Sequence, residues 1–265
     1  MEILRLTSIQ SASADSICRM IAQHLASRLG IRTEFVGNIR WPEREQLLDV
    51  GHIHVGWICG LPYVWKADQD PAPVQLLAAP VMLHPRYQER PIYFSDVVVH
   101  RDSRWTTFEE LRGASWAYNE PHSQSGYNIT RYHLATLGET SGYFSQVVEA
   151  GSHLRALEMV LARRVDASAI DSTVLELELQ RRPDLGDQIR IVEVLGPSPI
   201  PPWVVANSVP PDLRDAIGRV FLQMHEDPEG QPILAEGQMA RFVRVEDRDY
   251  DAIREMAQKA EQVRW

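Results

Sequence analysis

Cysteine is scarce in this sequence of 265 residues, which contains only Cys18 and Cys59. The two lie far apart in the chain, and neither has a cysteine or histidine partner at metal-ligand spacing. Disulfide-stapled scaffolds and structural zinc sites need several such residues close together. We therefore expect two small core residues, with a disulfide between them as the less favoured alternative.

Runs of positive charge and long apolar runs are also missing. The chain has 27 Lys and Arg against 36 Asp and Glu, a formal charge of −9, whereas a nucleic-acid surface needs a basic patch. No apolar stretch approaches the roughly 20 residues that span a bilayer. The start, Met1–Leu6, alternates like a strand and does not lead into the apolar region of an export signal. We expect no nucleic-acid partner.

Several motifs that carry chemistry are absent. The sequence has neither Gly-x-Gly-x-x-Gly nor a P-loop, and its nine histidines form no His-Glu-x-x-His or Cys/His group. Ser123 and Ser125 do not lie in a Gly-x-Ser-x-Gly elbow. We therefore expect no metal site and no cofactor.

What remains is the composition of a soluble globular protein, with 44% hydrophobic and 24% charged residues. The length suits one large domain or two lobes, each with its own core. Residues 3–9, 33–36 and 53–58 read as strands, and a polar turn at 8–13 opens a helix that Gly30 ends. A short helix at 42–50 completes a βαβαβ opening.

The rest of the chain continues to alternate. Strands are predicted at 74–82, 91–100, 114–118, 147–148, 165–170, 189–195 and 203–206, and helices at 125–137, after 152, after 171, at 212–226 and at 247–263. We expect a hairpin-like loop at 84–90, a turn and short helix at 102–111, and a rigid proline-rich connector at 196–202.

The stretch from Asn119 to Tyr127 follows the strand at 114–118 and precedes a helix. A helix start has free backbone N–H groups, and Ser123 or Ser125 can cap it or turn a hydroxyl to a ligand. Gly126 would let a bound anion approach the backbone. Taken alone, an ordinary capped helix is the favoured interpretation.

Other turns after strands are rich in hydroxyl, aromatic and imidazole groups. In open α/β sheets, ligands bind at the carboxyl ends of strands. His153 is at even odds a local packing residue or a donor to ligand oxygen. For Asp171 a helix N-cap is favoured over a partner for a cationic ligand group. Trp57 and Tyr63 are core aromatics or cleft walls, and Tyr93 could lie at a hinge. The set suits a small oxyanion held by neutral donors.

Six short stretches occur in a shared order from about Val55 to the end: 91–99, 102–103 with 111–113, 122–127, 151–153 with 156–157, 165–172 and 249–251. In this order they resemble the phosphonate-binding family of periplasmic solute-binding proteins, which serves phosphate, phosphite and phosphonate ABC transporters. The first-lobe loop departs from the family's usual Gly-Pro, because Cys59-Gly60-Leu61-Pro62 stands there.

The resemblance implies an α/β type II periplasmic-binding-protein fold with two lobes, mixed sheets flanked by helices, a two-strand hinge and an interlobe cleft. Lobe 1 would comprise residues 1–94 and 201–265, and lobe 2 residues 95–200. The implied ligand-binding residues are Trp57, Gly60, Leu61, Tyr63, Tyr93, Ser123, Gln124, Ser125, Gly126, His153 and Asp171.

The implied function is the capture of a small anionic or zwitterionic molecule, phosphonate- or phosphate-like, by a monomeric periplasmic protein that delivers it to an ABC permease without catalysis. One alternative is a cytoplasmic enzyme on the same fold, similar to chorismate dehydratase or thiamine-precursor synthases, with His153 or Asp171 as acid or base. Another is a cytoplasmic ligand sensor. Either a removed leader or a cytoplasmic location would account for the missing signal.

Overall fold

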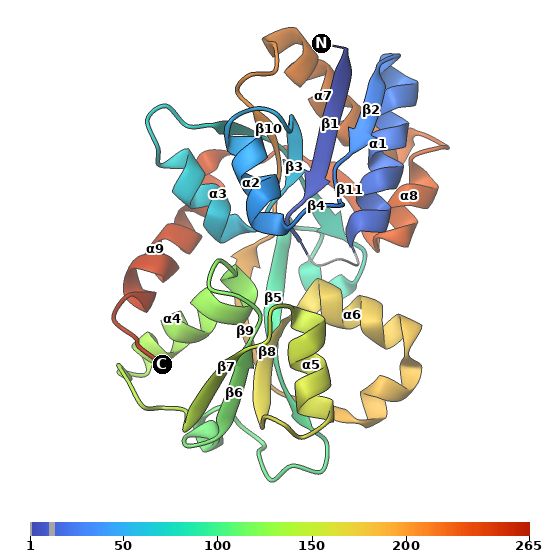
Figure 1. Ribbon diagram of the computed structural model, residues 1–265. Coiled ribbons are helices and arrows are strands. Elements are labelled where there is room, and N and C mark those ends of the chain that lie inside the picture. Colours follow the sequence, from blue (N-terminus) through green and yellow to red (C-terminus); the bar gives the residue numbers. More distant parts are fainter. Residues whose placement is uncertain (1, 11–13) are drawn as a thin grey trace. The chain divides into compact units, whose positions relative to one another are not determined.

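The computed structural model describes residues 2–10 and 14–265, which form two compact α/β units (Figure 1). Unit 1 comprises Met1–Ile92 and Pro199–Asp251, and unit 2 comprises Tyr93–Ser198 and Ala252–Trp265. The chain therefore passes between the units three times. The sequence-based boundaries differ at the C-terminal end, because residues 252–265 were expected in the first lobe. They belong to unit 2, where the Trp265 ring stacks on Tyr118.

Unit 1 contains a six-stranded mixed sheet. Its strands are β1 (Ile3–Ser8), β2 (Arg32–Phe35), β3 (Val55–Trp57), β4 (Val74–Met82), β10 (Trp203–Ala206) and β11 (Met239–Val243), in the order β11-β4-β10-β3-β1-β2. Strand β1 pairs in parallel with β2 and β3, which confirms the βαβαβ opening. Strand β10 is antiparallel to β3 and β4, and β11 is antiparallel to β4.

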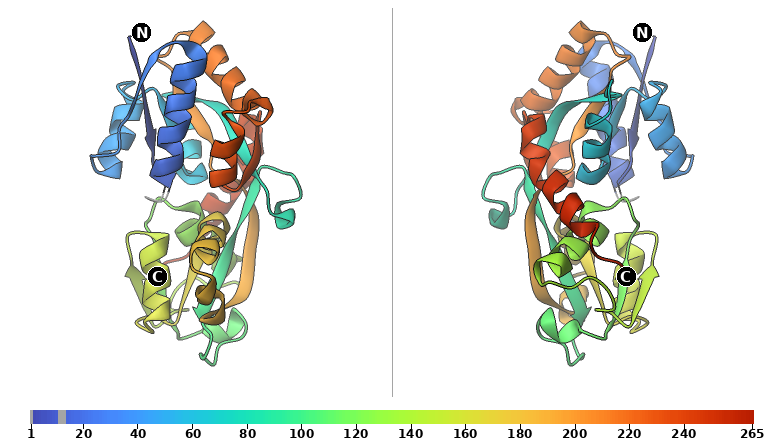
Figure 2. Two further views of the ribbon diagram at one scale, coloured as in Figure 1. Left: turned by 90° about the vertical axis from the view of Figure 1, so that its right-hand side faces the viewer. Right: turned by 90° about the vertical axis from the view of Figure 1, so that its left-hand side faces the viewer.

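The helices of unit 1 are α1 (Asp15–Leu29), α2 (Trp41–Asp49), α3 (Gly60–Ala67), α7 (Pro211–Gln223) and α8 (Gln231–Glu236), with 3₁₀ turns at Met224–Glu226 and Asp247–Tyr250. Gly30, with φ 64°, ends α1 as predicted. Positions 11–13 of the predicted polar turn lie outside the described residues. Helix α1 packs against both α7 and α8 (Figure 2). The short elements α8 and β11 were not predicted.

Unit 2 contains a five-stranded sheet. Its strands are β5 (Ile92–His100), β6 (Ser115–Tyr118), β7 (Gln146–Glu149), β8 (Ala167–Asp171) and β9 (Ile189–Pro199), in the order β7-β6-β8-β5-β9. Strand β6 is parallel to β7 and β8, and β5 is antiparallel to β8. Strands β4 and β5 belong to different sheets, so the hairpin predicted at 84–90 is wrong; a 3₁₀ turn, Pro85–Tyr87, lies there.

The proline-rich connector predicted at 196–202 is also partly wrong, because β9 runs through Pro199. Prolines break an interior strand, but β9 is the edge strand of its sheet, where a missing N–H costs no ladder bond.

The helices of unit 2 are α4 (Ile129–Thr136), α5 (His153–Leu161), α6 (Ser172–Arg181) and α9 (Asp251–Ala260), with 3₁₀ turns at Glu109–Leu111 and Pro183–Asp187. One core cluster centres on Phe108, Trp116 and Phe144, and a second on Leu157 and Ile170. These apolar clusters fix the ends of β6 and β8, where the candidate site lies. Across the described parts of both units, no helix is long and apolar enough to cross a membrane.

Candidate ligand-binding site

The segment after β6 contains a turn of π-helix, Gln124–Asn128, which continues directly into α4. Ser123 precedes this turn, and its Oγ accepts a hydrogen bond from the Gly126 N–H at 3.0 Å. The predicted serine cap is thus confirmed. The regular α-helix predicted from Ser125 is wrong in its first turn, which is wider; such turns occur often at functional sites.

Ser125 lies in this π-turn, and its Oγ is 3.0 Å from His153 Nε2. His153 is the first residue of α5, which begins at the Ser152 cap predicted from the sequence: Ser152 Oγ accepts from the Arg155 N–H. The amide nitrogen of Asn119, just after β6, is 3.2 Å from the same Nε2. The stretch after β6 and the first residue of α5 therefore meet at one imidazole nitrogen.

The hydrogen bonds around His153 indicate which ring nitrogen carries the proton. Nε2 faces the Asn119 amide nitrogen, which can only donate, so Nε2 is the acceptor. The Ala169 backbone also hydrogen bonds to the ring and favours its protonated form. The Asp171 N–H also faces Nδ1, but at 3.4 Å this contact is too long to decide the tautomer.

Burial lowers the pKa of His153 to about 4, and the bond to the Ala169 backbone offsets part of that shift. The imidazole is therefore neutral at pH 7. Ser125, His153 and Asn119 hydrogen bond to one another without a charged side chain among them. The group can orient a hydroxyl donor towards an anion, but it does not neutralise the anion's charge.

Glycine is required at position 126 because the neighbouring atoms leave no room for a Cβ. The backbone conformation does not require it, because the φ of Gly126 lies outside the left-handed region. A Cβ at this position would lie 2.1 Å from Asn119 Oδ1 and 3.0 Å from His153 Cε1. Asn119, which is 7% exposed, is a functional candidate to which sequence reasoning gave no role. The only available signal was its place directly after a strand, at the head of the serine-containing stretch.

Asp171 ends β8 and caps α6, as favoured from the sequence. Its Oδ1 accepts from the Thr173 N–H at 2.8 Å and from the Thr173 hydroxyl at 2.7 Å. Burial raises the pKa of Asp171 to about 6, nearby Asp96 adds to the rise, and the bonds from Thr173 oppose it.

The side chain of Gln124 is fully buried, and its amide forms hydrogen bonds to other residues of unit 2. Its Nε2 donates to Ser198 Oγ at 3.2 Å and contacts Met256 Sδ at 3.1 Å, while its Oε1 accepts from Asn128. Tyr93, the second residue of β5, is 1% exposed. Both lie in unit 2 with Ser125 and His153.

Of the five site residues predicted in the first lobe, Tyr93 lies in unit 2, and the other four, Trp57, Gly60, Leu61 and Tyr63, lie in unit 1. Trp57 donates from Nε1 to the Pro201 carbonyl at 2.9 Å and stacks on Trp203, in keeping with the structural alternative. Tyr63 donates its hydroxyl proton to Asp247 Oδ1 at 2.7 Å. Gly60 and Leu61 were expected on a loop, but they begin α3 and are buried.

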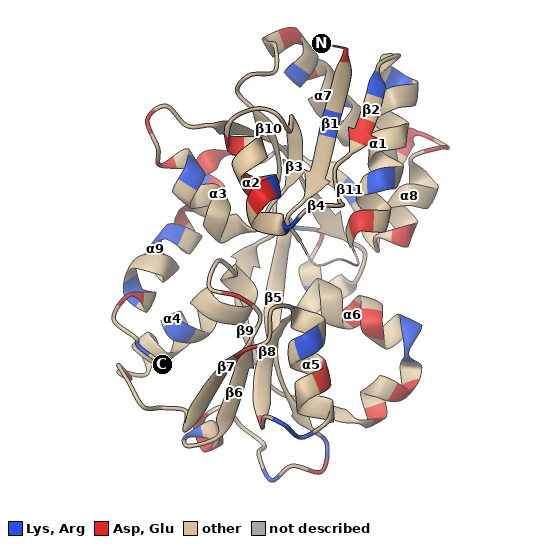
Figure 3. Cartoon of the chain, viewed as in Figure 1, with Lys and Arg blue, Asp and Glu red and all other residues tan. Residues whose placement is uncertain are grey.

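Titratable and charged side chains are spread over both units (Figure 3). In residues 2–10 and 14–265, no group of three or more His, Cys, Asp and Glu is placed to hold a metal ion. Figure 3 shows acidic and basic residues interspersed along the helices of both units. Both cysteines are free thiols.

Two mixed sheets flanked by helices, with a serine-capped turn at the carboxyl end of a strand, define a protein of the type II periplasmic-binding-protein class. The sequence model of the periplasmic substrate-binding proteins of phosphonate ABC transporters matches residues 6–250, and the chain belongs to this family. The predicted fold and family are confirmed. A family of transporter binding proteins does not favour the enzyme alternative.

Solved structures show the same fold. A binding-protein component of an ABC phosphonate transporter from Pseudomonas aeruginosa superposes with a TM-score of 0.85 at 17% identity, covering 98% of this chain and 86% of that one. PhnD1 from Prochlorococcus marinus, in complex with methylphosphonate, gives 0.86 at 16% identity and 99% coverage of both chains. A Xanthomonas citri protein bound to ATP gives 0.77 at 18% identity, covering 99% of this chain and 98% of that one.

Proposed function

We propose that this substrate-binding protein captures a small phosphonate, or a closely related phosphorus oxyanion, at the turn formed by residues 123–126. The observation that carries the proposal is the arrangement of Ser125: its hydroxyl is held 3.0 Å from a neutral imidazole, in a turn whose Gly126 N–H is already fixed by Ser123. An anionic oxygen would accept hydrogen bonds from the Ser125 hydroxyl and from backbone N–H groups at the start of the helix.

Asn119 makes it possible for Ser125 to switch its hydrogen bond from His153 to the ligand. When Ser125 turns its proton from His153 to a ligand oxygen, the Asn119 amide still donates to Nε2. The buried imidazole therefore keeps a partner in both states, which avoids the cost of about 1–3 kcal/mol for an unsatisfied buried acceptor. In this proposal His153 orients Ser125, and the Gln124 side chain supports the turn from inside unit 2.

The proposal extends to delivery and location. The ligand would pass to an ABC permease, and the protein would act as a periplasmic monomer, in line with a family described as periplasmic substrate-binding proteins. Tyr93 and Asp171 in unit 2, and Trp57, Gly60, Leu61 and Tyr63 in unit 1, remain proposed contributors to ligand binding.

Isothermal titration calorimetry tests the ligand class. Methylphosphonate, phosphite, phosphate, methanesulfonate, acetate and ATP are titrated in turn, and we expect one of the first three to bind most tightly. Ser125→Ala should weaken that binding by roughly 10- to 100-fold, because a hydrogen bond to a charged group contributes about 1.5–3 kcal/mol.

Thr106→Ala is the matched control, since the Thr106 hydroxyl also forms a local hydrogen bond in unit 2, to Glu110 Oε2 at 2.9 Å. It should leave affinity unchanged. The proposed ligand class is wrong if methylphosphonate, phosphite and phosphate all fail to bind. The proposed binding position at residues 123–126 is wrong if Ser125→Ala binds as the wild type does. Phosphorus NMR of the incubated ligand should show no chemical conversion.

A further inference from the structure

The C-terminal segment, residues 252–265, contacts the π-turn at both of its ends. We call this segment the C-terminal arm. It contains most of α9 and the residues after it, and it packs within unit 2 although α9 starts at Asp251 of unit 1. None of its residues was predicted to bind ligand.

The first contact fixes the beginning of the turn. Met256 Sδ lies 3.1 Å from Gln124 Nε2 and 3.9 Å from Ser198 Oγ, which itself accepts from Gln124 at 3.2 Å. The other end of the Gln124 amide accepts from Asn128 Nδ2 at 2.7 Å, across the π-turn. The arm therefore holds the side chain that braces the turn internally.

The second contact fixes the end of the turn. The Trp265 ring packs edge-on against Tyr127, with centroids 5.3 Å apart, and stacks on Tyr118 at 5.9 Å and 13°. Arg131 donates from Nη2 and Nε to the Val263 carbonyl at 2.8 and 3.1 Å. The same guanidinium lies 4.9 Å from the centre of the Tyr127 ring.

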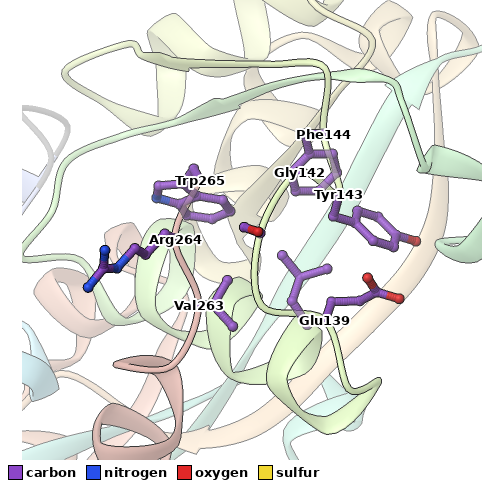
Figure 4. Close-up of a pocket in the computed structure, with 9 residues that line it drawn as sticks. Glu139, Gly142, Tyr143, Phe144, Val263, Arg264 and Trp265 are labelled. Atoms are coloured by element: carbon purple, nitrogen blue, oxygen red, sulfur yellow. The ribbon is translucent and has the colours of Figure 1, made fainter.

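The end of the arm is itself anchored. The Arg264 N–H donates to the Thr140 carbonyl at 2.8 Å, and Arg264 forms a parallel bridge with Ser141. Figure 4 shows Val263, Arg264 and Trp265 along one side of a pocket, with Tyr143 and Phe144 opposite. Trp265 is thus held between the loop at 140–144 and the aromatic rings beside the turn.

We propose that the C-terminal arm is a positioning element for the ligand turn. It holds the π-turn 124–128 at Gln124 and at Tyr127, so that the Ser125 hydroxyl between them stays aligned with His153. The effect on affinity rests on the proposed function, whereas the effect on the order of the turn does not. Trp265 and Met256 are positioning residues that act through Tyr127 and Gln124.

Hydrogen–deuterium exchange and calorimetry with methylphosphonate test the proposal on the full chain. In Trp265→Ala, amide exchange in peptides covering 119–129 should accelerate about tenfold or more, and methylphosphonate affinity should fall about tenfold. Met256→Leu keeps the side-chain volume but removes the sulfur contact, so it should speed exchange at the Gln124 end of the turn. Trp265→Phe should restore most of the protection.

Val160→Ala is the matched control, because Val160 is a fully buried residue of α5 in the other core cluster of unit 2. It should lower the melting temperature without changing exchange in 119–129 beyond its effect on the rest of unit 2. If Trp265→Ala and Met256→Leu behave like Val160→Ala, the arm only covers the core and the proposal is wrong. If the wild-type protein binds none of methylphosphonate, phosphite and phosphate, the proposed function fails, and the exchange data still decide the role of the arm.

Discussion

Adding one methyl group at Gly126 gives the sharpest test of the site geometry. In Gly126→Ala the new Cβ would meet Asn119 Oδ1 at 2.1 Å, Asn119 Cγ at 2.8 Å and His153 Cε1 at 3.0 Å. Contacts this short force a neighbour to move. Asn119 is buried and its amide donates to His153, so it cannot move without losing that hydrogen bond.

The expected cost has two parts. Overpacking a tight interior costs about 1–3 kcal/mol. Rotating the Asn119 amide away from Nε2 adds about 1 kcal/mol for the lost hydrogen bond if the turn yields in that direction. For a chain of this size, each kcal/mol corresponds to roughly 2–4 °C in melting temperature. The displaced turn should also weaken phosphonate binding by about tenfold or more, since Ser125 lies next to the substituted position.

Thermal unfolding and calorimetry with methylphosphonate measure both effects. Gly186→Ala is the control, because the nearest atom to a Cβ there is Leu179 Cδ2 at 3.7 Å, an ordinary contact. The double variant Asn119→Gly with Gly126→Ala should recover much of the lost stability, because the clashing amide is gone, but not the affinity. The assigned geometry is refuted if Gly126→Ala is as stable as Gly186→Ala, or if removal of the Asn119 side chain recovers nothing.

The pKa shifts of His153 and Asp171 have opposite effects on stability between pH 6 and pH 4. For His153 the folded pKa of about 4 lies below the ordinary 6.5, so the unfolded state binds the proton first and stability falls as pH drops through this range. For Asp171 the folded pKa of about 6 lies above 3.8, so stability rises as pH drops. Each shift corresponds to about 3 kcal/mol, so the two effects offset each other.

Three further predictions follow from the structure. Asp171→Asn should remove the offset, so that the free energy of unfolding, measured by urea titration, falls between pH 6 and pH 4 by up to about 3 kcal/mol more than in the wild type; an equal pH dependence would contradict the raised pKa of Asp171. Ser123→Ala should lose about 1 kcal/mol of stability as a cap deletion and should also weaken methylphosphonate binding, whereas Thr106→Ala should leave that binding unchanged. Lys66→Met should lower the free energy of unfolding, measured by urea titration, by about 2 kcal/mol, because it leaves the carboxylates of Asp49 and Glu45 without the buried ammonium that lies 2.7 and 2.9 Å from them; an unchanged free energy would show that these pairs contribute little.

The sequence by itself determined the elements that depend on local chemistry. Apolar periodicity located α1 and the parallel strands of the opening, and Gly30 marked where α1 ends, because a left-handed residue stops a helix regardless of its surroundings. The caps at Ser152 and Asp171 were likewise predictable, since a cap binds a backbone N–H only two or three residues away. The ordered motifs also indicated the family that the comparison confirms.

Tertiary structure alone decided how these pieces are used. Asn119, Ser125 and His153 meet only because β6, the π-turn and α5 are brought together by the packing of unit 2, and no local pattern encodes that meeting. The same holds for Gly126, whose φ is unremarkable and whose neighbours forbid a side chain. Trp57 and Tyr63, by contrast, found partners inside unit 1.

The C-terminal arm shows the same division. Its helical periodicity was readable, because α9 has a buried stripe at Ile253 and Ala260. The membership of the arm in unit 2 could not be predicted from the sequence. It depends on the Val263 carbonyl, the Met256 thioether and the Trp265 indole, which each contact a group more than a hundred residues away in the chain. Contacts at that separation are set by the packing of the whole unit, which a local pattern of residues does not record.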